Sequence, residues 1–255
     1  MRVIILAAGY ATRLRPLTTN TSKSLLEVGK KKIIDRILEK IGTIKKVVDS
    51  MYVITNEKFF QNFSNWLKTT RYGDKVSLIN DGSTTNENRL GAINDLAVVI
   101  RDRAIEDDLL VVAGDNLFEF SLDKFLKFAK AHPDGVTIAL YDIGSLELAK
   151  SFGVVEIDAH DRIVDFQEKP SNPKSTLVST GVYYFPKEKI SFISEYVKMK
   201  KGFDAPGHYI GWLSQADKVY GFRFKEDWYD IGNIESYKNA DNEYLKRERK
   251  NNDET

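Results

Sequence analysis

The sequence predicts an α/β protein with a largely parallel β-sheet covered by helices on both faces. In the first half of the chain, apolar runs alternate with amphipathic stretches in the order β-α-β-α-β-α-β-α-β. Strands that are apolar throughout are typical of parallel sheets buried on both sides. The chain has 255 residues, of which 42% are hydrophobic, and this is enough for one large domain or two small ones.

The expected elements follow one another with short connections. Strand-like apolar runs lie at residues 3–7, 52–55, 76–80, 109–113, 136–141, 154–157, 163–167, 178–185 and 219–224. Helical periodicity is found at residues 33–41, 58–70, 92–102, 122–131, 187–198, 209–216 and 234–249. After residue 142 the order changes, and residues 153–170 (GVVEIDAHDRIVDFQEKP) predict a hairpin in a β-rich insertion beside the sheet.

Charge and cysteine content limit the classes of partner and compartment. Lys and Arg number 38 against 37 Asp and Glu, so the net charge of +1 gives no reason to expect nucleic acid or an acidic membrane as partner. The chain has no cysteine, which excludes disulfides and thiol catalysis and fits a reducing compartment. The apolar start ends at Gly9, too early for a signal peptide, and no 18-residue apolar run follows. We expect a soluble cytoplasmic protein.

The segment LAAGYATRLRPLTTNTSKSLLEVG, which follows the first strand, places cations where α/β proteins bind phosphates. It matches neither the dinucleotide-binding nor the Walker fingerprint. Gly9 would let backbone N–H groups approach a phosphate, while Arg13 and Lys23 would neutralise its charge. The alternative interpretation is a surface loop with solvated cations.

Two aspartates are candidates for a metal site. Asp115 ends the apolar strand of DDLLVVAGDN, and the carboxyl ends of parallel strands border the ligand crevice of such folds. Asp230 lies in EDWYDIGNIESY, just before a helix. Carboxylates are the ligands that Mg²⁺ prefers, so the two residues could form one Mg²⁺ site if the fold brings them together. Alternatively, each is a capping or turn residue.

Two polar segments are candidates for substrate contacts. In FQEKP, Glu168 could accept hydrogen bonds from sugar hydroxyls and Lys169 could bind a phosphate, although a plain charged turn is the commoner fate of such a sequence. The long polar stretch at residues 80–96 could read a nucleobase through Asn80, Asn86 and Gly91, or be a mobile loop. The three histidines are scattered without metal-binding spacing, and no Ser-His-Asp arrangement supports nucleophilic catalysis.

Taken in order, these segments resemble the sugar-1-phosphate nucleotidyltransferases, nearest the glucose-1-phosphate thymidylyltransferase-like branch. The family pattern G-x-G-T-R-L-x-P-L-T followed by P-K-x-L-L-x-V stands here as GYATRLRPLT and SKSLLEVG. Its strand ending in G-D-N stands as VVAGDN, and its Y-G-V-V hairpin ending in E-K-P as FGVVEIDAHDRIVDFQEKP. The glycine-bearing strand and W-x-D-x-G stand as STGVYYF and WYDIG. The likeness covers about residues 1–240.

The resemblance implies a Rossmann-like three-layer α/β/α sandwich with a mostly parallel mixed sheet and a β-rich sugar-binding insertion. It implies one domain over residues 1–240, with a nucleotide-binding part (about 1–142), a sugar-binding part (about 143–225) and a return to the metal site (226–240). The charged residues 241–255 would form a tail, and we expect its end, KRERKNNDET, to fray. The implied reaction joins an NTP and a sugar 1-phosphate into an NDP-sugar and pyrophosphate, by in-line attack without a covalent intermediate.

The resemblance also assigns roles residue by residue. It implies that Arg13 binds the β- and γ-phosphates, that Lys23 braces the α-phosphate, and that Lys169 binds the sugar phosphate. Asp115 and Asp230 would hold Mg²⁺. The implied nucleotide contacts are Leu6, Ala7, Gly9, Thr12, Arg13, Asn80, Asn86, Gly91 and Asp115. The implied sugar-phosphate contacts are Gly153, Glu168, Lys169 and Gly181.

The chain departs from the family pattern at four places. Ala11 replaces the second glycine of the pattern, and Ser22 replaces the proline before Lys23. The loop at residues 80–91 is longer than in the pattern, and residues 202–213 differ from E-L-E-I-T-D.

The nucleotide is expected to be dTTP or UTP, with CTP as a further candidate, and the sugar stays open. Homo-oligomers are common in the family, while no hexapeptide β-helix domain and so no acetyl transfer is expected. Transfer to a non-sugar phosphate such as phosphocholine, a silent sugar-nucleotide binder and a glycosyltransferase are the alternatives.

Overall fold

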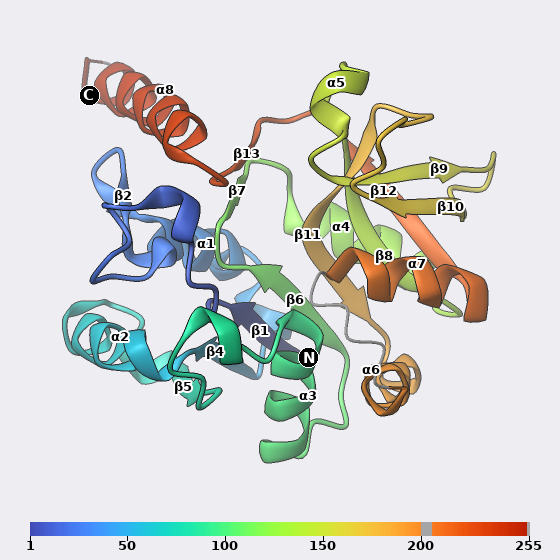
Figure 1. Cartoon of the computed structure of the whole chain (residues 1–255), viewed down its shortest axis with the longest axis horizontal. Helices are drawn as coiled ribbons and strands as arrows, with labels where there is room; N and C mark the ends of the chain where they lie inside the picture. The colour runs from blue at the N-terminus through green and yellow to red at the C-terminus, as the bar shows by residue number, and fades with distance from the viewer. Residues whose placement is uncertain (200–205, 254–255) are drawn as a thin grey trace.

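The main β-sheet of this protein is a mixed sheet of nine strands with helices on both faces (Figure 1). A computed structural model describes residues 1–199 and 206–253. Along the sheet the strands run in the order β10-β9-β11-β6-β1-β4-β5, and β8 pairs with both β11 and β12. The nine strands are β1 (Arg2–Leu6), β4 (Ser50–Thr55), β5 (Val76–Asn80), β6 (Leu109–Ala113), β8 (Val136–Asp142), β9 (Gly153–Ile157), β10 (Ile163–Glu168), β11 (Leu177–Phe185) and β12 (Val219–Phe224). The predicted α/β sandwich with a mixed sheet is therefore confirmed.

The first half of the chain supplies four neighbouring parallel strands of the sheet. Strand β1 pairs in parallel with β4 and β6, and β4 pairs in parallel with β5. The carboxyl ends of β1 and β6 consequently lie side by side, with Leu6 opposite Ala113. This shared edge is where ligands bind in open parallel sheets, because the loops that leave neighbouring strands meet there.

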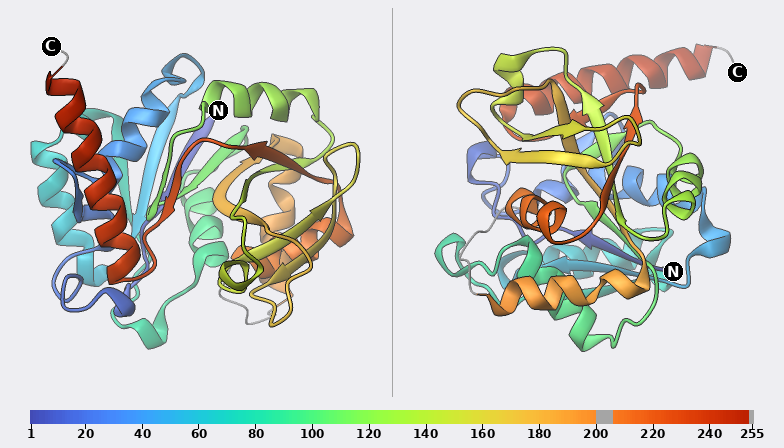
Figure 2. Two further views of the ribbon diagram at one scale, coloured as in Figure 1. Left: turned by 90° about the horizontal axis from the view of Figure 1, so that it is seen from above. Right: turned by 90° about the vertical axis from the view of Figure 1, so that its right-hand side faces the viewer.

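Alternating side chains of the central strand face two separate cores. Val3 and Ile5 of β1 belong to one buried cluster, while Ile4 belongs to the other. The first cluster takes in α1 (Ile33–Gly42), α2 (Glu57–Thr69), α4 (Leu122–Ala131) and α8 (Ile234–Asp253). The second takes in α3 (Ala92–Asp102), α6 (Ser191–Lys198) and α7 (Pro206–Ala216). Two helical layers thus enclose the sheet, as Figure 2 shows.

The hairpin predicted at residues 153–170 is confirmed, and it extends the main sheet. Strands β9 and β10 are antiparallel, with Glu168 opposite Gly153. The hairpin joins the rest of the sheet through β11, where Val178 lies opposite Val154. Helix α7 packs on β10, and the short helix α5 (Leu146–Ala149) precedes β9. Of the segment at 202–213 that departs from the family pattern, residues 202–205 lie outside the described residues.

Four very short strands lie outside the predicted elements. Strands β2 (Glu27–Val28) and β3 (Lys31–Lys32) form a small hairpin after the cation-rich segment. Strands β7 (Asn116–Phe118) and β13 (Trp228–Asp230) pair antiparallel although they are more than 100 residues apart in sequence. Two- and three-residue strands are too short for a period of two to be visible in the sequence.

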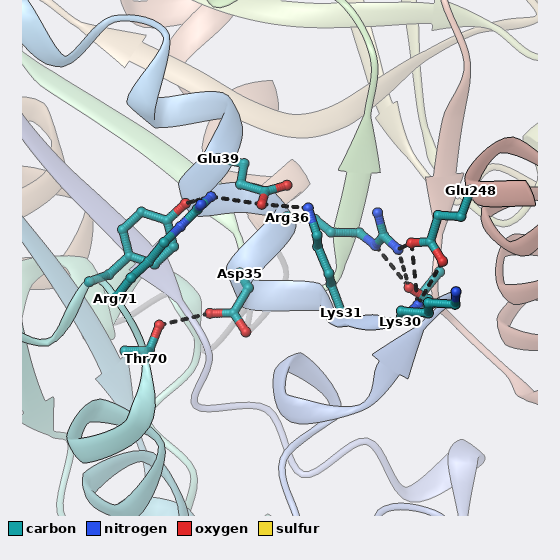
Figure 3. A network of polar contacts seen from close by, with 10 residues as sticks. Lys30, Lys31, Asp35, Arg36, Glu39, Thr70, Arg71 and Glu248 are labelled. Atoms are coloured by element: carbon teal, nitrogen blue, oxygen red, sulfur yellow. Dashed lines mark hydrogen bonds and ion pairs between the residues drawn. The ribbon is translucent and has the colours of Figure 1, made fainter. Parts of the chain in front are cut away.

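The last helix is anchored to earlier parts of the chain at Arg247 and Glu248, which lie near the start of the segment KRERKNNDET that we expect to fray; residues 254–255 of that segment lie outside the described residues. The Arg36 guanidinium donates to Glu248 Oε1 at 2.5 Å, and the backbone N–H of Lys30 donates to Glu248 Oε2 at 3.1 Å (Figure 3). Arg247 pairs with Asp227. Because these partners lie in the β2–β3 hairpin, in α1 and before β13, α8 joins both ends of the chain. None of the helices in residues 1–199 and 206–253 has the length and apolar character needed to cross a membrane.

Candidate active site

The loop that follows β1 is held by buried polar contacts. Asn56 is fully buried, and its side chain both caps α2 through the Phe59 N–H (3.0 Å) and donates to the Ala8 carbonyl (2.8 Å). The Thr18 hydroxyl donates to the Ala11 carbonyl at 2.8 Å. Ala11 itself is left-handed, with φ 46° and ψ 44°, at the position where the family pattern has glycine. The alanine therefore keeps the loop conformation at the cost of local backbone strain.

Arg13 and Lys23 of this loop lie at the same edge of the sheet. Arg13 is exposed and lines a cleft together with Asp115 and Asp230. The Lys23 ammonium lies 2.5 Å from Asp115 Oδ2 and donates to the Ile231 carbonyl at 2.7 Å. Gly9 is exposed, and a Cβ placed on it would meet nothing within 4 Å, so the backbone there is open to a ligand.

The pairing of β7 with β13 brings the two predicted metal carboxylates together. Asp115 precedes β7 directly, and Asp230 is the residue of β13 that lies opposite Asn116. The Asn116 amide donates to Asp115 Oδ1 at 2.8 Å and to Asp230 Oδ1 at 3.5 Å. We call Lys23, Asp115, Asn116 and Asp230 the carboxylate corner.

The two carboxylates differ in pKa because their electrostatic surroundings differ. Burial raises the pKa of Asp230 to about 6, and the negative charge of Asp115 adds to this rise. Burial acts in the same direction on Asp115, but the charge and hydrogen bond of Lys23 outweigh it and leave its pKa lowered. Asp230 thus carries a charge that the fold does not fully compensate, which is the condition that a bound divalent cation would relieve.

Asn116 and Trp228 are site residues that the sequence reasoning missed. The Trp228 indole N–H donates to Asn116 Oδ1 at 2.7 Å, so the amide nitrogen of Asn116 must face the two carboxylates. Both residues lie inside motifs that were recognised, G-D-N and W-x-D-x-G, next to the aspartates. A signal was therefore present, but the cross-strand contact between the motifs could not be read from either one.

A single cleft of about 490 Å³ joins the carboxylate corner to the hairpin. It is bordered by Leu6 and Arg13 on one side and by residues of β9, β10 and β11 on the other. The predicted residues that line it are Leu6, Arg13, Asp115, Gly153, Glu168, Lys169, Gly181 and Asp230. Phe152, Tyr183 and Gly207 also line it and were not predicted.

The hairpin side of the cleft presents a carboxylate next to a cation. Glu168 Oε1 lies 3.4 Å from the Lys169 ammonium. Lys169 has φ +48°, unusual for a residue with a side chain, and its backbone N–H donates to the Phe152 carbonyl at 2.9 Å. Gly181 has φ +76°, and a Cβ there would lie 2.8 Å from Ala113 Cβ. Burial raises the pKa of Tyr183 to about 12, so its phenol is neutral at physiological pH.

The predicted base-reading residues lie apart from this cleft. We call residues 80–91 the base-side loop. Asn80 is engaged locally, since its amide contacts Glu57 and its Oδ1 accepts from the Gly82 N–H at 2.9 Å. Asn86 and Thr12 line a separate hollow of about 300 Å³. Gly91, with φ +88°, begins α3, and Ala7 is buried at the end of β1.

The described residues contain no group of three or more His, Asp or Glu side chains placed to hold a metal ion. The carboxylate corner offers two carboxylates. This donor set fits Mg²⁺ when a bound substrate supplies phosphate oxygens, because Mg²⁺ is usually held by one or two carboxylates, waters and phosphates.

Comparison with known proteins agrees with this geometry. The model of the nucleotidyl transferase family matches residues 2–247, so the chain belongs to that family. The chain is 32% identical over 235 residues to the bifunctional protein GlmU of Methanocaldococcus jannaschii. That match covers 91% of this chain and 51% of the relative, so the chain spans about half the length of that protein. The resemblance to sugar-1-phosphate nucleotidyltransferases is confirmed.

Solved structures share the fold over nearly the whole chain. One is described as a glucose-1-phosphate thymidylyltransferase from Bacillus anthracis in complex with sucrose; it has a TM-score of 0.81, 23% identity and coverage of 96% of this chain and 95% of that one. Another is a UDP-glucose pyrophosphorylase complexed with UDP-glucose, with a TM-score of 0.80, 18% identity and coverage of 96% and 98%.

Proposed function

We propose that this protein transfers a nucleoside monophosphate from an NTP to a sugar 1-phosphate, giving an NDP-sugar and pyrophosphate with Mg²⁺. The observation that carries the proposal is the single cleft that joins Arg13 and the carboxylate corner to Glu168 and Lys169. It places groups suited to a triphosphate beside groups suited to a phosphorylated sugar. The nucleotidyl transferase family and its sugar-nucleotide relatives support the same reaction.

The cations of the opening loop serve the phosphates. Arg13 presents a planar fork of donors to the β- and γ-phosphates, the part that leaves as pyrophosphate. Lys23 braces the α-phosphate. Because it pairs with Asp115 in the structure, it is already held at the edge of the sheet where that phosphate would bind. The loop backbone at Gly9 and Ala7, with Thr12 and Leu6, borders the nucleotide.

Asp115 and Asp230 would hold Mg²⁺, and Asn116 keeps both carboxylates directed at one point. The ion supplies charge neutralisation at the phosphate oxygens when it is bound. Trp228 fixes the Asn116 amide, so the corner is organised before substrate arrives.

The sugar phosphate attacks the NTP directly, and no covalent enzyme intermediate forms. One of its phosphate oxygens forms a bond to the α-phosphorus as the bond from that phosphorus to the β-bridging oxygen breaks. Lys169 holds the attacking phosphate, while Glu168 accepts hydrogen bonds from the sugar hydroxyls. Gly153 and Gly181 let the backbone come close to the sugar. Catalysis consists of positioning and charge neutralisation.

For the nucleotide we propose dTTP or UTP, with CTP as a further candidate, read by the base-side loop through Asn80, Asn86 and Gly91. The likeness to a thymidylyltransferase and to a UDP-glucose pyrophosphorylase supports the first two. The absence of cysteine is in keeping with the cytoplasm, which we propose as the location.

The test is pyrophosphate release with Mg²⁺ in a grid of five nucleotides against sugar 1-phosphates and phosphocholine. The nucleotides are dTTP, UTP, CTP, GTP and ATP, and Asp230→Asn serves as the matched inactive variant. Strong pyrophosphate release with one nucleotide and one sugar 1-phosphate confirms the proposal and identifies both substrates. Release only with phosphocholine, or an empty grid while nucleotide still raises the unfolding temperature, would contradict it.

A further inference from the structure

The Glu168 carboxylate is seated between two glycines from different elements. A Cβ placed on Gly207, the second residue of α7, would lie only 1.8 Å from Glu168 Oε2 and 2.7 Å from its Cδ. A Cβ on Gly153, which lies opposite Glu168 in the β9–β10 register, would lie 3.2 Å from the same oxygen. We call Gly153 and Gly207 the glycine slot. The Glu168 carboxylate fits between these residues because neither residue 153 nor residue 207 carries a side chain.

The slot fixes one carboxylate oxygen and leaves the other for contacts. Oε2 faces the glycine slot, whereas Oε1 faces the Lys169 ammonium at 3.4 Å. The Glu168 side chain is only 12% exposed, so few other positions are open to it. Gly207 lies in the first turn of an 11-residue helix, where the positive end of the helix dipole favours a nearby carboxylate.

We propose that Gly207 is a positioning residue for the sugar subsite, because its missing side chain allows Glu168 to keep the orientation that binds sugar hydroxyls. This inference rests on the proposed role of Glu168. Gly207 lies in the segment 202–213 that departs from the family pattern, whereas Gly153 lies in the family's Y-G-V-V motif. A side chain at position 207 displaces the carboxylate and weakens binding of the sugar 1-phosphate, while the nucleotide side of the cleft is unchanged.

The chain supplies a matched control in the same helix. Gly211 lies one turn after Gly207 on α7 and also faces β10, but a Cβ there would lie 3.5 Å from the Phe166 carbonyl oxygen, an ordinary contact. Alanine favours a helix over glycine at both positions, so neither variant is expected to unfold. The atoms that obstruct a Cβ at Gly207 belong mainly to the end of the Glu168 side chain, so it is the carboxylate and not the backbone that must move.

The kinetic test compares Gly207→Ala with Gly211→Ala. We expect Gly207→Ala to raise the KM for the sugar 1-phosphate about 10- to 100-fold, the effect of losing a hydrogen bond to a charged group. Its KM for the NTP, and both KM values of Gly211→Ala, should stay within about twofold. Equal sugar KM values for the two variants would overturn the inference.

A double-mutant cycle separates positioning from a general effect on the cleft. Aspartate is one methylene shorter than glutamate, so Glu168→Asp withdraws the carboxylate from the slot. In that background we expect Gly207→Ala to raise the sugar KM less than about threefold. The same increase in both backgrounds would show that Gly207 acts independently of Glu168 and would refute the inference.

A measurement without turnover keeps the inference distinct from the proposed reaction. In protein with ¹³C-labelled glutamate, the Glu168 side-chain signal can be assigned by its loss in Glu168→Gln. We expect this signal to shift in Gly207→Ala and to stay in place in Gly211→Ala. A shift in a protein whose wild type makes no NDP-sugar would refute the proposed function alone, whereas an unshifted signal would refute the role of Gly207.

Discussion

The carboxylate corner and the base-side loop lie at the same edge of the sheet but are held in opposite ways. In the corner, Lys23 contacts Ile231 across 208 residues of sequence, and Asn116 contacts Asp230 across 114. In the loop, the Asn88 side chain accepts from the backbone of Thr84 and Thr85, only four and three residues away. The corner exists only in the complete fold, whereas the loop makes its own local structure.

The carboxylate corner and the base-side loop also differ in the charged groups that they contain. The corner concentrates a cation and two carboxylates whose pKa values move in opposite directions. The base-side loop holds several of its polar groups within itself, including a capping box formed by Thr85 and Asn88, although the Asn80 amide contacts Glu57 outside the loop. From this comparison we expect the chemistry to depend on the corner, and we expect changes in the sequence or length of the loop to leave the reaction intact.

The largest effect is expected from Asp230→Asn. Loss of this carboxylate should reduce Mg²⁺-dependent pyrophosphate release by at least about 10³-fold, because it removes one of two groups that hold charge at the reacting phosphates. The fold should survive, since the raised pKa of Asp230 shows that its charge is unfavourable in the folded state. Asp123→Asn, which changes an exposed carboxylate of α4 outside the cleft, is the matched control. Full activity of Asp230→Asn would remove the metal assignment.

Lys23→Met should follow in size. We expect kcat to fall about 10²-fold, because a preorganised donor to the α-phosphate is lost. The free energy of unfolding should fall by about 1–3 kcal/mol, since Asp115 then keeps a partly buried charge with no cation beside it. Thermal unfolding checks the second number. An unchanged stability would mean that the Lys23–Asp115 pair contributes little to the fold.

The pH dependence of stability should show the corner directly in metal-free protein. The pKa of Asp230 is about 6 in the folded state, above its usual value of 3.8, so the folded state binds more protons between these pH values. The stabilisation is therefore complete below pH 3.8 and is lost as pH rises through 6, on the order of 3 kcal/mol. The measurement is the difference in unfolding free energy between wild type and Asp230→Asn. Taking this difference cancels other carboxylates, such as Asp81 in the loop, whose pKa burial also raises. If this difference stays constant from pH 4 to pH 7, the pKa of Asp230 is not raised in the folded protein.

Trp228→Phe should have a smaller effect on the corner. The variant keeps an aromatic ring beside Tyr141 and Phe152 but loses the N–H that orients Asn116. We expect kcat to fall about tenfold and the stability by about 1 kcal/mol, the size of one hydrogen bond. Wild-type kcat would show that the Asn116 amide is oriented without the indole.

The smallest effect is expected in the base-side loop. Asn88→Ala removes one side of the capping box and should lower stability by at most about 1 kcal/mol. The KM for the NTP should change a few-fold, about the value of one lost loop contact, and kcat should not change. A collapse of kcat comparable to that of Asp230→Asn would erase the distinction between the two regions.

Much of the fold could be predicted from the sequence because its signals are local. The runs at 76–80, 109–113 and 219–224 coincide with β5, β6 and β12, since buried strands in a covered sheet are apolar throughout. The run at 92–102 coincides with α3. The strands β7 and β13 could not be found in this way, because three residues show no periodicity and their pairing depends on the path of the whole chain.

The candidate site could be predicted residue by residue but not contact by contact. Strand ends and motifs indicated Asp115 and Asp230, and the structure places them beside the same Asn116 amide. The pair between Lys23 and Asp115, the indole contact of Trp228 and the glycine slot each join distant segments. The anchoring of Glu248 by Arg36 was missed for the same reason, because a charged tail looks alike in sequence whether it is free or bound.

The central claim is that the carboxylate corner holds a divalent cation and that the base-side loop contributes no ligand to that cation. Electron paramagnetic resonance can measure Mn²⁺ bound to wild type, Asp230→Asn and Asn88→Ala in the presence of a non-hydrolysable NTP. The account predicts one tightly bound ion in wild type and in Asn88→Ala, and at least about tenfold weaker binding in Asp230→Asn. Equal binding by all three proteins would place the metal outside the corner and would contradict the account.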